Sequence, residues 1–414
     1  MVSTARIGEN GDIQLPDVYR RRWGLDPGAD LMVQETPEGL LIRRADPPLT
    51  KLYVEPTNLC NLRCRTCVRN SWSDPQGTMS IELYRRMADG LRNLPSLRQV
   101  NFWGIGEPLL HPDIVEMVEL AKGLGARTQM ITNGLLLTRE LGAGLLSVGL
   151  DSLVVSVDGA SPEVQADVRS GADLNRMKNN LIGLREVCLE REMAWPEIGI
   201  EFVAMRSNVD QLREIRSLAV FLGASFIVVT NLLPYNREMS DEILYGMYAG
   251  GCYPMYRTRW TPEIILPRMD NRQEVMEPVM RMLEHTNSND FPRARLDGAG
   301  GYCRFVGEGA AAVGWSGDVS PCIALMHSYP VYVMGRQKQI RRYVLGNVGE
   351  EEITSIWDKE EYVAFRRRVQ RWEFSPCTDC GGCHLADFNE EDCFGNTHPV
   401  CGDCLWAKGV IQCP

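Results

Sequence analysis

Cys60-Asn-Leu-Arg-Cys64-Arg-Thr-Cys67 is the stretch on which the interpretation of the whole sequence depends. Its three thiols are spaced four and three residues apart, and it follows an apolar run, Leu52-Tyr-Val-Glu-Pro56, that predicts a β-strand. Three thiolates on one tight loop can hold three irons of a [4Fe–4S] cluster, which leaves the fourth iron without a protein ligand. A small chelating molecule can bind at that open iron.

Two other uses of these three cysteines fit the sequence less well. A structural zinc site needs four ligands, and no nearby histidine or cysteine completes the set. A disulfide arrangement would leave one of the three thiols over. The pattern therefore favours an iron–sulfur cluster.

The length and composition of the chain are those of a multidomain globular protein. It has 414 residues, enough for two or three domains. No apolar run reaches the ~18 residues that a membrane span needs, and the N-terminus lacks the hydrophobic region of a secretory signal. We therefore expect a cytoplasmic protein, in which fourteen cysteines favour metal binding because disulfides are rare in that compartment. The net charge of −10 gives no general attraction to nucleic acid or anionic membranes.

Residues 1–46 predict a small domain of β-hairpins. Alternating residues surround a turn at Asn10-Gly11, which is a strong hairpin signal. A short helix is predicted over residues 17–23, and two more alternating runs over 30–35 and 39–44. The segment to residue 50 holds six Arg against eight Asp or Glu, so its net charge disfavours DNA, whose affinity comes mainly from phosphate contacts.

Residues 50–235 alternate between predicted strands and predicted helices. The strands are expected at 52–54, 99–103, 127–131, 152–157, 198–203 and 226–232. Strands that alternate with helices pair in parallel, and the active site of such an α/β fold lies at the carboxyl ends of the strands. The cysteine loop follows the first strand at that end.

Polar groups follow several of the other predicted strands. The second strand ends in Gly104-Ile-Gly-Glu107-Pro, where glycines let the backbone approach a ligand and the Glu107 carboxylate can bind a cationic amine. The fourth ends in Ser156-Val-Asp158-Gly159 and the sixth in Asn231-Leu-Leu-Pro234. Each alone is usually only a turn or a loop, but together and in this order they indicate a ligand site.

The cysteine spacing and these motifs resemble the signature of the radical S-adenosylmethionine (radical SAM) superfamily. Thr66 departs from it, because the family usually has an aromatic residue there, and so does Ile105, which replaces the first glycine of a glycine-glycine-glutamate-proline motif. The resemblance implies a partial (β/α)6 TIM-type barrel in which Cys60, Cys64 and Cys67 hold a [4Fe–4S] cluster. It also implies that SAM chelates the open iron and is reductively cleaved to a 5′-deoxyadenosyl radical.

The same resemblance implies roles for five residues in binding SAM. Glu107 would meet its amine, Ser156 and Asp158 its ribose hydroxyls and Arg169 its carboxylate, while Asn231 would lie by its adenine.

Cysteines become dense again after residue 300, in a region that follows an expected linker of mixed helix and loop at 236–300. Nine lie in the last 112 residues, and none is forced into a pair: Cys303, Cys322, Cys377, Cys380, Cys383, Cys393, Cys401, Cys404 and Cys413. This density predicts metal clusters. A zinc ribbon made from the two Cys-x₂-Cys pairs at 377–380 and 401–404 is an alternative, but it leaves Cys303 and Cys322 unexplained.

Residues 301–414 resemble the SPASM extension of radical SAM maturases, through the start at Cys303 and Gly317-x₄-Cys322 and through the run Phe374-Ser-Pro-Cys377. The resemblance implies one or two auxiliary [4Fe–4S] clusters. It assigns Cys303, Cys322 and Cys383 to the first, and Cys377, Cys380 and Cys401 to the second. Cys393, Cys404 and Cys413 are also expected to be metal ligands, but the tail departs from the usual spacing, so the resemblance does not say which cluster each of them would bind.

Residues 1–46 resemble the swapped-hairpin (AbrB-like) domain of bacterial transition-state regulators and antitoxins. The match lies in Gly11–Pro16, Arg20–Gly28 and Leu40-Leu-Ile42. In that family two chains interleave to form one barrel, which implies a homodimer through this segment.

The combination of the three regions resembles the radical SAM maturases associated with tungsten-containing aldehyde ferredoxin oxidoreductase-type enzymes. It implies an enzyme that matures such a protein, at its polypeptide or its pterin cofactor, with a low-potential ferredoxin or flavodoxin as electron donor. Two alternatives stay open, namely a peptide-modifying SPASM maturase of another substrate and an iron–sulfur transcription regulator built on the hairpin domain.

Overall fold

The structure is a computed structural model that describes most of the chain. The described residues are 6–17, 20, 25, 31–36, 39–44, 46–72, 74–92, 94–245, 263–265, 269–270, 272–283, 302–333, 335–375, 377 and 383–412. Cys252, Cys380 and Cys413 lie outside the described residues, as do most of the helix predicted at 17–23 and much of the linker predicted at 236–300.

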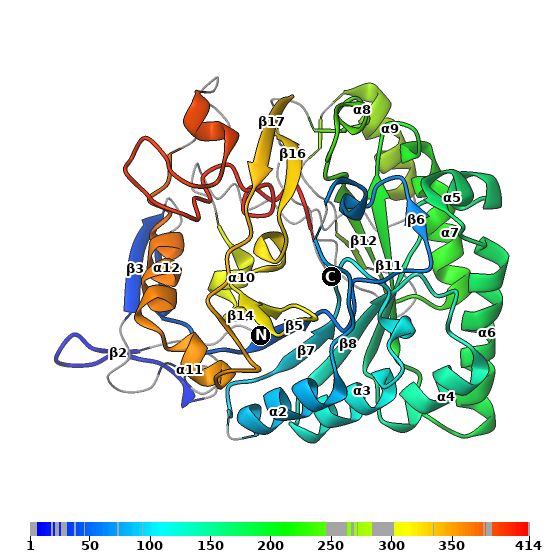
Figure 1. The fold of residues 1–414 in the computed structure, drawn as a ribbon, viewed down its shortest axis with the longest axis horizontal. Helices are drawn as coiled ribbons and strands as arrows, with labels where there is room; N and C mark the ends of the chain where they lie inside the picture. Colours follow the sequence, from blue (N-terminus) through cyan, green and yellow to red (C-terminus); the bar gives the residue numbers. More distant parts are fainter. Residues whose placement is uncertain are drawn as a thin grey trace.

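A curved parallel sheet forms the centre of the molecule (Figure 1). Its six central strands confirm the six predicted from the sequence, namely β5 (Lys51–Val54), β7 (Gln99–Phe102), β8 (Arg127–Thr132), β9 (Ser152–Ser156), β11 (Glu197–Ala204) and β12 (Phe226–Asn231). Each pairs in parallel with the next, from β5 to β12. At the β12 edge the short strand β13 (Glu263–Ile265), which the sequence did not predict, is added in parallel.

Amphipathic helices cover the outside of this sheet because the chain returns through a helix after each strand. They are α2 (Ile81–Leu91), α3 (Ile114–Gly123), α4 (Arg139–Ser147), α5 (Pro162–Val168), α6 (Leu174–Glu190) and α7 (Leu212–Leu222). Ser80 caps α2 as predicted, accepting a hydrogen bond from the backbone of Leu83. The carboxyl ends of the strands are thereby left open, and the cysteine loop lies there.

The C-terminal region continues the core sheet. Strand β14 (Ala310–Val313) pairs in parallel with β5, and β15 (Asp318–Ser320) and β18 (Gly346–Asn347) follow in antiparallel pairing, so that this sheet has ten strands among the described residues. The remaining elements are α10 (Arg304–Gly307), the hairpin β16 (Tyr329–Val333) and β17 (Arg336–Ile340), α11 (Ile353–Trp357) and α12 (Glu360–Arg371). Shared strand pairing fixes the cysteine-rich region against the first strand of the core.

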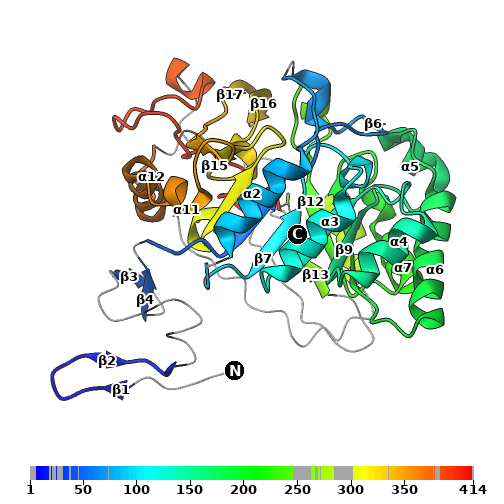
Figure 2. The same cartoon turned by 60° about the horizontal axis from the view of Figure 1, so that its bottom comes forward.

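Two separate hairpins precede the core and project to one side of it (Figure 2). They are β1 (Arg6–Ile7) with β2 (Ile13–Gln14), and β3 (Leu31–Thr36) with β4 (Gly39–Arg44), all antiparallel as predicted. Their link to the core is held by the fully buried Arg366 of α12, whose Nε donates to Asp46 at 2.8 Å and whose guanidinium lies 4.0 Å from the ring centre of Trp357. No helix in the described part of the chain is long and apolar enough to cross a membrane.

Candidate active site

Cys60, Cys64 and Cys67 are brought together on the loop after β5, each as a half-buried free thiol. Burial raises the pKa of the Cys64 thiol to about 11, the nearby Arg169 guanidinium opposes this rise, and the sulfurs of Cys67 and Cys60 add to it. Iron binding must therefore displace protons from this loop, because only thiolates are ligands. The backbone amide of Leu62 already points at the sulfur of Cys60, at 3.4 Å.

The thiols fit the predicted cluster better than a single metal ion. Within the described ranges, no group of three or more His, Cys, Asp or Glu side chains is arranged to hold one ion. A cubane cluster needs its protein sulfurs further apart than one zinc ion does, and it accepts three ligands where structural zinc requires four. The donor set on this loop is therefore suited to a cluster with an open iron.

A short antiparallel ladder places Arg169 beside the cysteine loop. Strand β10 (Arg169–Ser170) pairs with β6 (Arg63–Cys64), so Arg169 lies directly opposite Cys64. The Arg169 Nε is 2.7 Å from the carboxylate of Asp158, which is fully buried and also accepts a 2.8 Å hydrogen bond from the backbone of Val203. This ion pair holds a cation next to the three thiols, where a ligand carboxylate would need one.

Glu201 lies in the same group of charges and was missed from the sequence. It pairs with Ser156 across β11 and β9, and the Ser156 hydroxyl donates to it at 3.4 Å. Burial raises the pKa of Glu201 to about 7, Arg169 lowers it and Asp158 raises it further. A single acid inside the otherwise apolar run Ile198–Val203 was the available signal, because strands of a covered parallel sheet are normally apolar throughout.

The side chain of Glu107 is buried and forms its hydrogen bonds with other residues of the protein. It is 2% exposed, and its carboxylate accepts hydrogen bonds from the Thr132 hydroxyl at 2.6 Å, from the backbone of Asn133 at 2.8 Å and from the backbone of Leu109 at 3.1 Å. The side chain thus joins the ends of β7 and β8. Direct contact of this carboxylate with a ligand amine stays a prediction.

The end of β12 contacts the C-terminal tail. The Asn231 side chain donates to the carbonyl of Val410 at 2.9 Å, and the backbone of Gln412 donates to the Thr230 hydroxyl at 2.8 Å. Asn231 is therefore placed at the strand ends, as expected, but its amide is engaged by the tail. Its position beside adenine stays a prediction.

Four cysteines of the C-terminal region surround one apolar cavity: Cys303, Cys322, Cys401 and Cys404. Burial raises the pKa of Cys303 to about 12, and the neighbouring Cys404 adds to the rise. Burial likewise raises the pKa of Cys401, with contributions from Cys404, Cys303 and Cys322. Four cysteines lining one mainly apolar cavity are enough ligands for a [4Fe–4S] cluster.

The structure groups these cysteines differently from the division that the resemblance implied, and which of them share a cluster stays a prediction. Cys401 lies with Cys303 and Cys322 rather than with the second set, and Cys383 is exposed. The thiols of Cys377 and Cys393 instead share the Ser375 hydroxyl, at 3.6 and 3.1 Å. Because the partners of Cys401 and Cys404 are Cys303 and Cys322, the arrangement also argues against the zinc ribbon. Spacing alone could not reveal it, since these cysteines are up to about a hundred residues apart.

Comparison with known proteins identifies two family regions. Residues 54–219 match the model of the radical SAM superfamily, and residues 303–384 match that of an iron–sulfur cluster-binding domain named SPASM. The chain is also 31% identical over 371 residues to the tungsten-containing aldehyde ferredoxin oxidoreductase cofactor-modifying protein of Pyrococcus furiosus, covering 88% of this chain and 96% of that protein.

Solved structures share the fold at low sequence identity. Streptococcus suis SuiB bound to precursor peptide SuiA is 15% identical with a TM-score of 0.53, covering 77% of this chain and 67% of that one. Native anSMEcpe with bound AdoMet is 17% identical with a TM-score of 0.51, covering 82% of this chain and 88% of that one. At this sequence identity the matches concern the fold alone.

Proposed function

The chain belongs to the radical SAM superfamily and carries its SPASM extension, and we propose that it matures a tungsten-containing aldehyde ferredoxin oxidoreductase-type enzyme. The observation that carries the proposal is the similarity to the Pyrococcus furiosus cofactor-modifying protein, which extends over 96% of that protein. The modification would fall on the tungsten enzyme's polypeptide or on its pterin cofactor.

The residues of the strand-end site support radical SAM chemistry in specific ways. Cys60, Cys64 and Cys67 would hold the cluster, and Arg169, kept in place by Asp158, would receive the carboxylate of SAM. When bound, the cluster and SAM together supply a 5′-deoxyadenosyl radical. The Ser156 hydroxyl would bind the ribose, and the Glu201 carboxylate would do so in place of Asp158, which the resemblance implied but which is fully buried against Arg169.

The test is mass spectrometry of the tungsten enzyme produced with and without this protein. We expect a mass change in its polypeptide or in its extracted pterin only when the active protein is present. A matched control is co-production with the variant in which Cys60, Cys64 and Cys67 are alanine, which should leave the mass unchanged. An identical mass in all three preparations would contradict the proposal.

A peptide-modifying maturase is the second candidate. The fold is shared with SuiB, a structure of which contains a precursor peptide. A mass change in a short separate peptide, with none in the tungsten enzyme, would favour this candidate. For either substrate we propose a low-potential ferredoxin or flavodoxin as electron donor, and a cytoplasmic location because its fourteen cysteines suit a reducing compartment.

The N-terminal hairpins support the proposal of a homodimer. Ile7, Val33 and Leu40 are 73%, 60% and 68% exposed on two-stranded sheets. An isolated two-stranded hairpin is only marginally stable in water, and apolar strand faces of this kind need cover. A second copy of the same segment would supply that cover, as in the swapped-hairpin family.

Val33→Asp should therefore shift the full-length protein from dimer to monomer in light scattering. The substitution puts a charge into the apolar surface that the proposed dimer buries, which is strongly unfavourable without a partner charge. Val220→Asp is the matched control, because Val220 is 58% exposed on α7 of the core and should leave the mass unchanged. A monomeric parent protein would refute the proposed dimer.

A further inference from the structure

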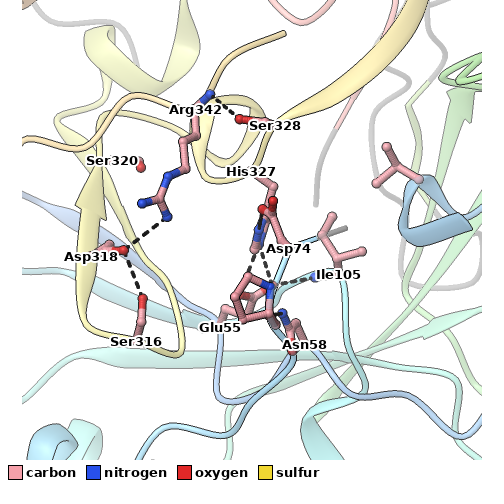
Figure 3. A network of polar contacts seen from close by, with 12 residues as sticks. Glu55, Asn58, Asp74, Ile105, Ser316, Asp318, Ser320, His327, Ser328 and Arg342 are labelled. Carbon is pink, nitrogen blue, oxygen red and sulfur yellow. Dashed lines mark hydrogen bonds and ion pairs between the residues drawn. The ribbon is translucent and has the colours of Figure 1, made fainter. Parts of the chain in front are cut away.

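A histidine from the C-terminal region reaches the first strand of the core. His327 follows the turn Ile323–Leu325, and its Nε2 lies 3.2 Å from both carboxylate oxygens of Glu55, the residue after β5. Its Nδ1 lies 3.1 Å from the carboxylate of Asp74 (Figure 3). The ring of Trp72 covers the imidazole at 4.1 Å between centroids. The contact joins the segment after the core cysteines to the segment after Cys322.

The contacts define the protonation state of His327. A carboxylate only accepts hydrogen bonds, so an imidazole held by carboxylates at both nitrogens must donate from both and carry a positive charge. Burial opposes that charge, but Glu55 and Asp74 outweigh it and raise the pKa of His327 above its usual range. These two are the charged groups against the ring in the described part of the chain. Arg342, in the same region, is paired with Asp318 instead (Figure 3).

Glu55 in turn fixes the turn that follows β7. One Glu55 oxygen accepts a 3.0 Å hydrogen bond from the backbone of Ile105. A Cβ at Gly104 would lie 2.4 Å from the Glu55 Cγ, and one at Gly106 would lie 2.1 Å from the carbonyl oxygen of Thr57. The turn is thus pressed against the segment that leads to the cysteine loop, and only glycine fits at these two positions.

We propose that His327 is a positioning residue that sets the SAM-binding turn Gly104–Glu107 by holding Glu55 in place. The inference rests on the proposed contact of this turn with SAM. Glu55 is fully buried, and among the described residues the cation that faces its carboxylate is His327 of the C-terminal region. Docking of that region therefore completes the geometry of the core site, and SAM affinity depends on a side chain that does not touch SAM.

The experiment measures SAM binding to the cluster-loaded, full-length protein. His327→Gln keeps a donor but removes the charge, and we expect a Kd for SAM roughly tenfold higher, the scale of losing a hydrogen bond between charged groups. The matched control is His398→Gln, because both His398 nitrogens face neutral main-chain carbonyls, of Asn389 at 3.1 Å and Arg342 at 3.3 Å. This control should bind SAM like the parent protein.

Two further measurements separate positioning from mere packing. In the SAM-free protein, His327→Gln should speed amide hydrogen exchange in peptides that contain Ile105, because Glu55 no longer holds that amide firmly. Adding Glu55→Gln to His327→Gln should recover SAM affinity, because the neutral side chain keeps an acceptor for Ile105 and removes the uncompensated charge. Packing alone would make the two losses add.

The affinity should also depend on pH in a defined direction. As the pH rises above about 6.5 and through the raised pKa of His327, the imidazolium loses its proton and the two carboxylates lose their shared cation. SAM binding should weaken across this window in the parent protein, and this dependence should be absent in His327→Gln.

The possible outcomes decide the inference. Unchanged Kd, exchange and pH profile in a folded His327→Gln protein would overturn it while leaving the proposed function intact. Failure of the parent protein to bind SAM would instead overturn the proposed function. If His327→Gln loses its clusters, the single variant Glu55→Gln tests the same inference, because a neutral residue 55 leaves no buried charge for His327 to compensate and the pH dependence of SAM binding should disappear.

Discussion

Replacing Cys60, Cys64 and Cys67 together with alanine should abolish reductive cleavage of SAM, leaving 5′-deoxyadenosine at the level of a reaction without protein. The three thiols are the only cysteines that the structure places on the loop after β5 within the described residues. With them removed, no iron centre can be held within reach of Arg169 and the strand ends. The measurement is chromatographic quantification of 5′-deoxyadenosine under reducing, anaerobic conditions.

The same variant should lose about four irons per chain and keep the rest, because a [4Fe–4S] cluster contains four and the C-terminal cysteines lie on separate segments. Cys188→Ala is the control, since Cys188 is buried in α6 and its thiol contacts only the carbonyl of Ala194 among the hydrogen-bond partners described. This control should keep full cleavage activity. Cleavage that persists in the triple variant would remove the core cysteines from the mechanism.

The strands of the core could be predicted from the sequence because they are short apolar runs between turn residues. Covered parallel strands are apolar on both faces, so the runs at 152–157 and 226–232 stand out without any knowledge of their neighbours. The helix from Ser80 could be predicted for a similar local reason, its cap and its apolar spacing.

The pairing of β14 with β5 could not be predicted in the same way. The run Ala310–Val313 is short and weakly apolar, and its partner strand lies more than 250 residues earlier. Only packing in three dimensions selects that register. The same reason hides the contact of His327 with Glu55, because neither residue belongs to a local motif and a lone histidine has no characteristic spacing.

The sequence motifs correctly predicted that charged residues lie at the carboxyl ends of the strands. The groups that these side chains contact come from other parts of the chain and could not be predicted from the motifs. Glu107 was expected to bind an amine because its carboxylate is negatively charged, but this carboxylate accepts hydrogen bonds from the Thr132 hydroxyl and the Asn133 amide at the end of β8. Arg169 lies beside the cysteine loop because β10 pairs with β6. A pairing of only two residues on each strand cannot be predicted from a sequence pattern. A motif therefore gives the place of a site more reliably than the partner of each side chain.

The grouping of the C-terminal cysteines predicts a loss of iron as large as that expected for the core-cysteine variant. The double variant Cys303→Ala/Cys401→Ala should lose about four irons per chain, because both thiols face the same cavity and would hold the same cluster. Cys303→Ala/Cys377→Ala should lose up to about eight irons per chain, because Cys377 lies with Cys393 at Ser375 and a second cluster there would be lost too. Iron analysis and Mössbauer spectroscopy of anaerobically reconstituted protein measure both.

The division implied by the family resemblance makes the opposite prediction for the first variant. If Cys401 belonged with Cys377 and Cys380, removing it together with Cys303 would damage two clusters, whereas Cys303→Ala/Cys383→Ala would damage one. In the structure Cys383 is exposed, whereas burial raises the pKa of Cys401 and the nearby Cys404, Cys303 and Cys322 add to that rise. Cysteines that line the same cavity are expected to bind the same cluster, so Cys303→Ala/Cys401→Ala should lose no more iron than one cluster contains.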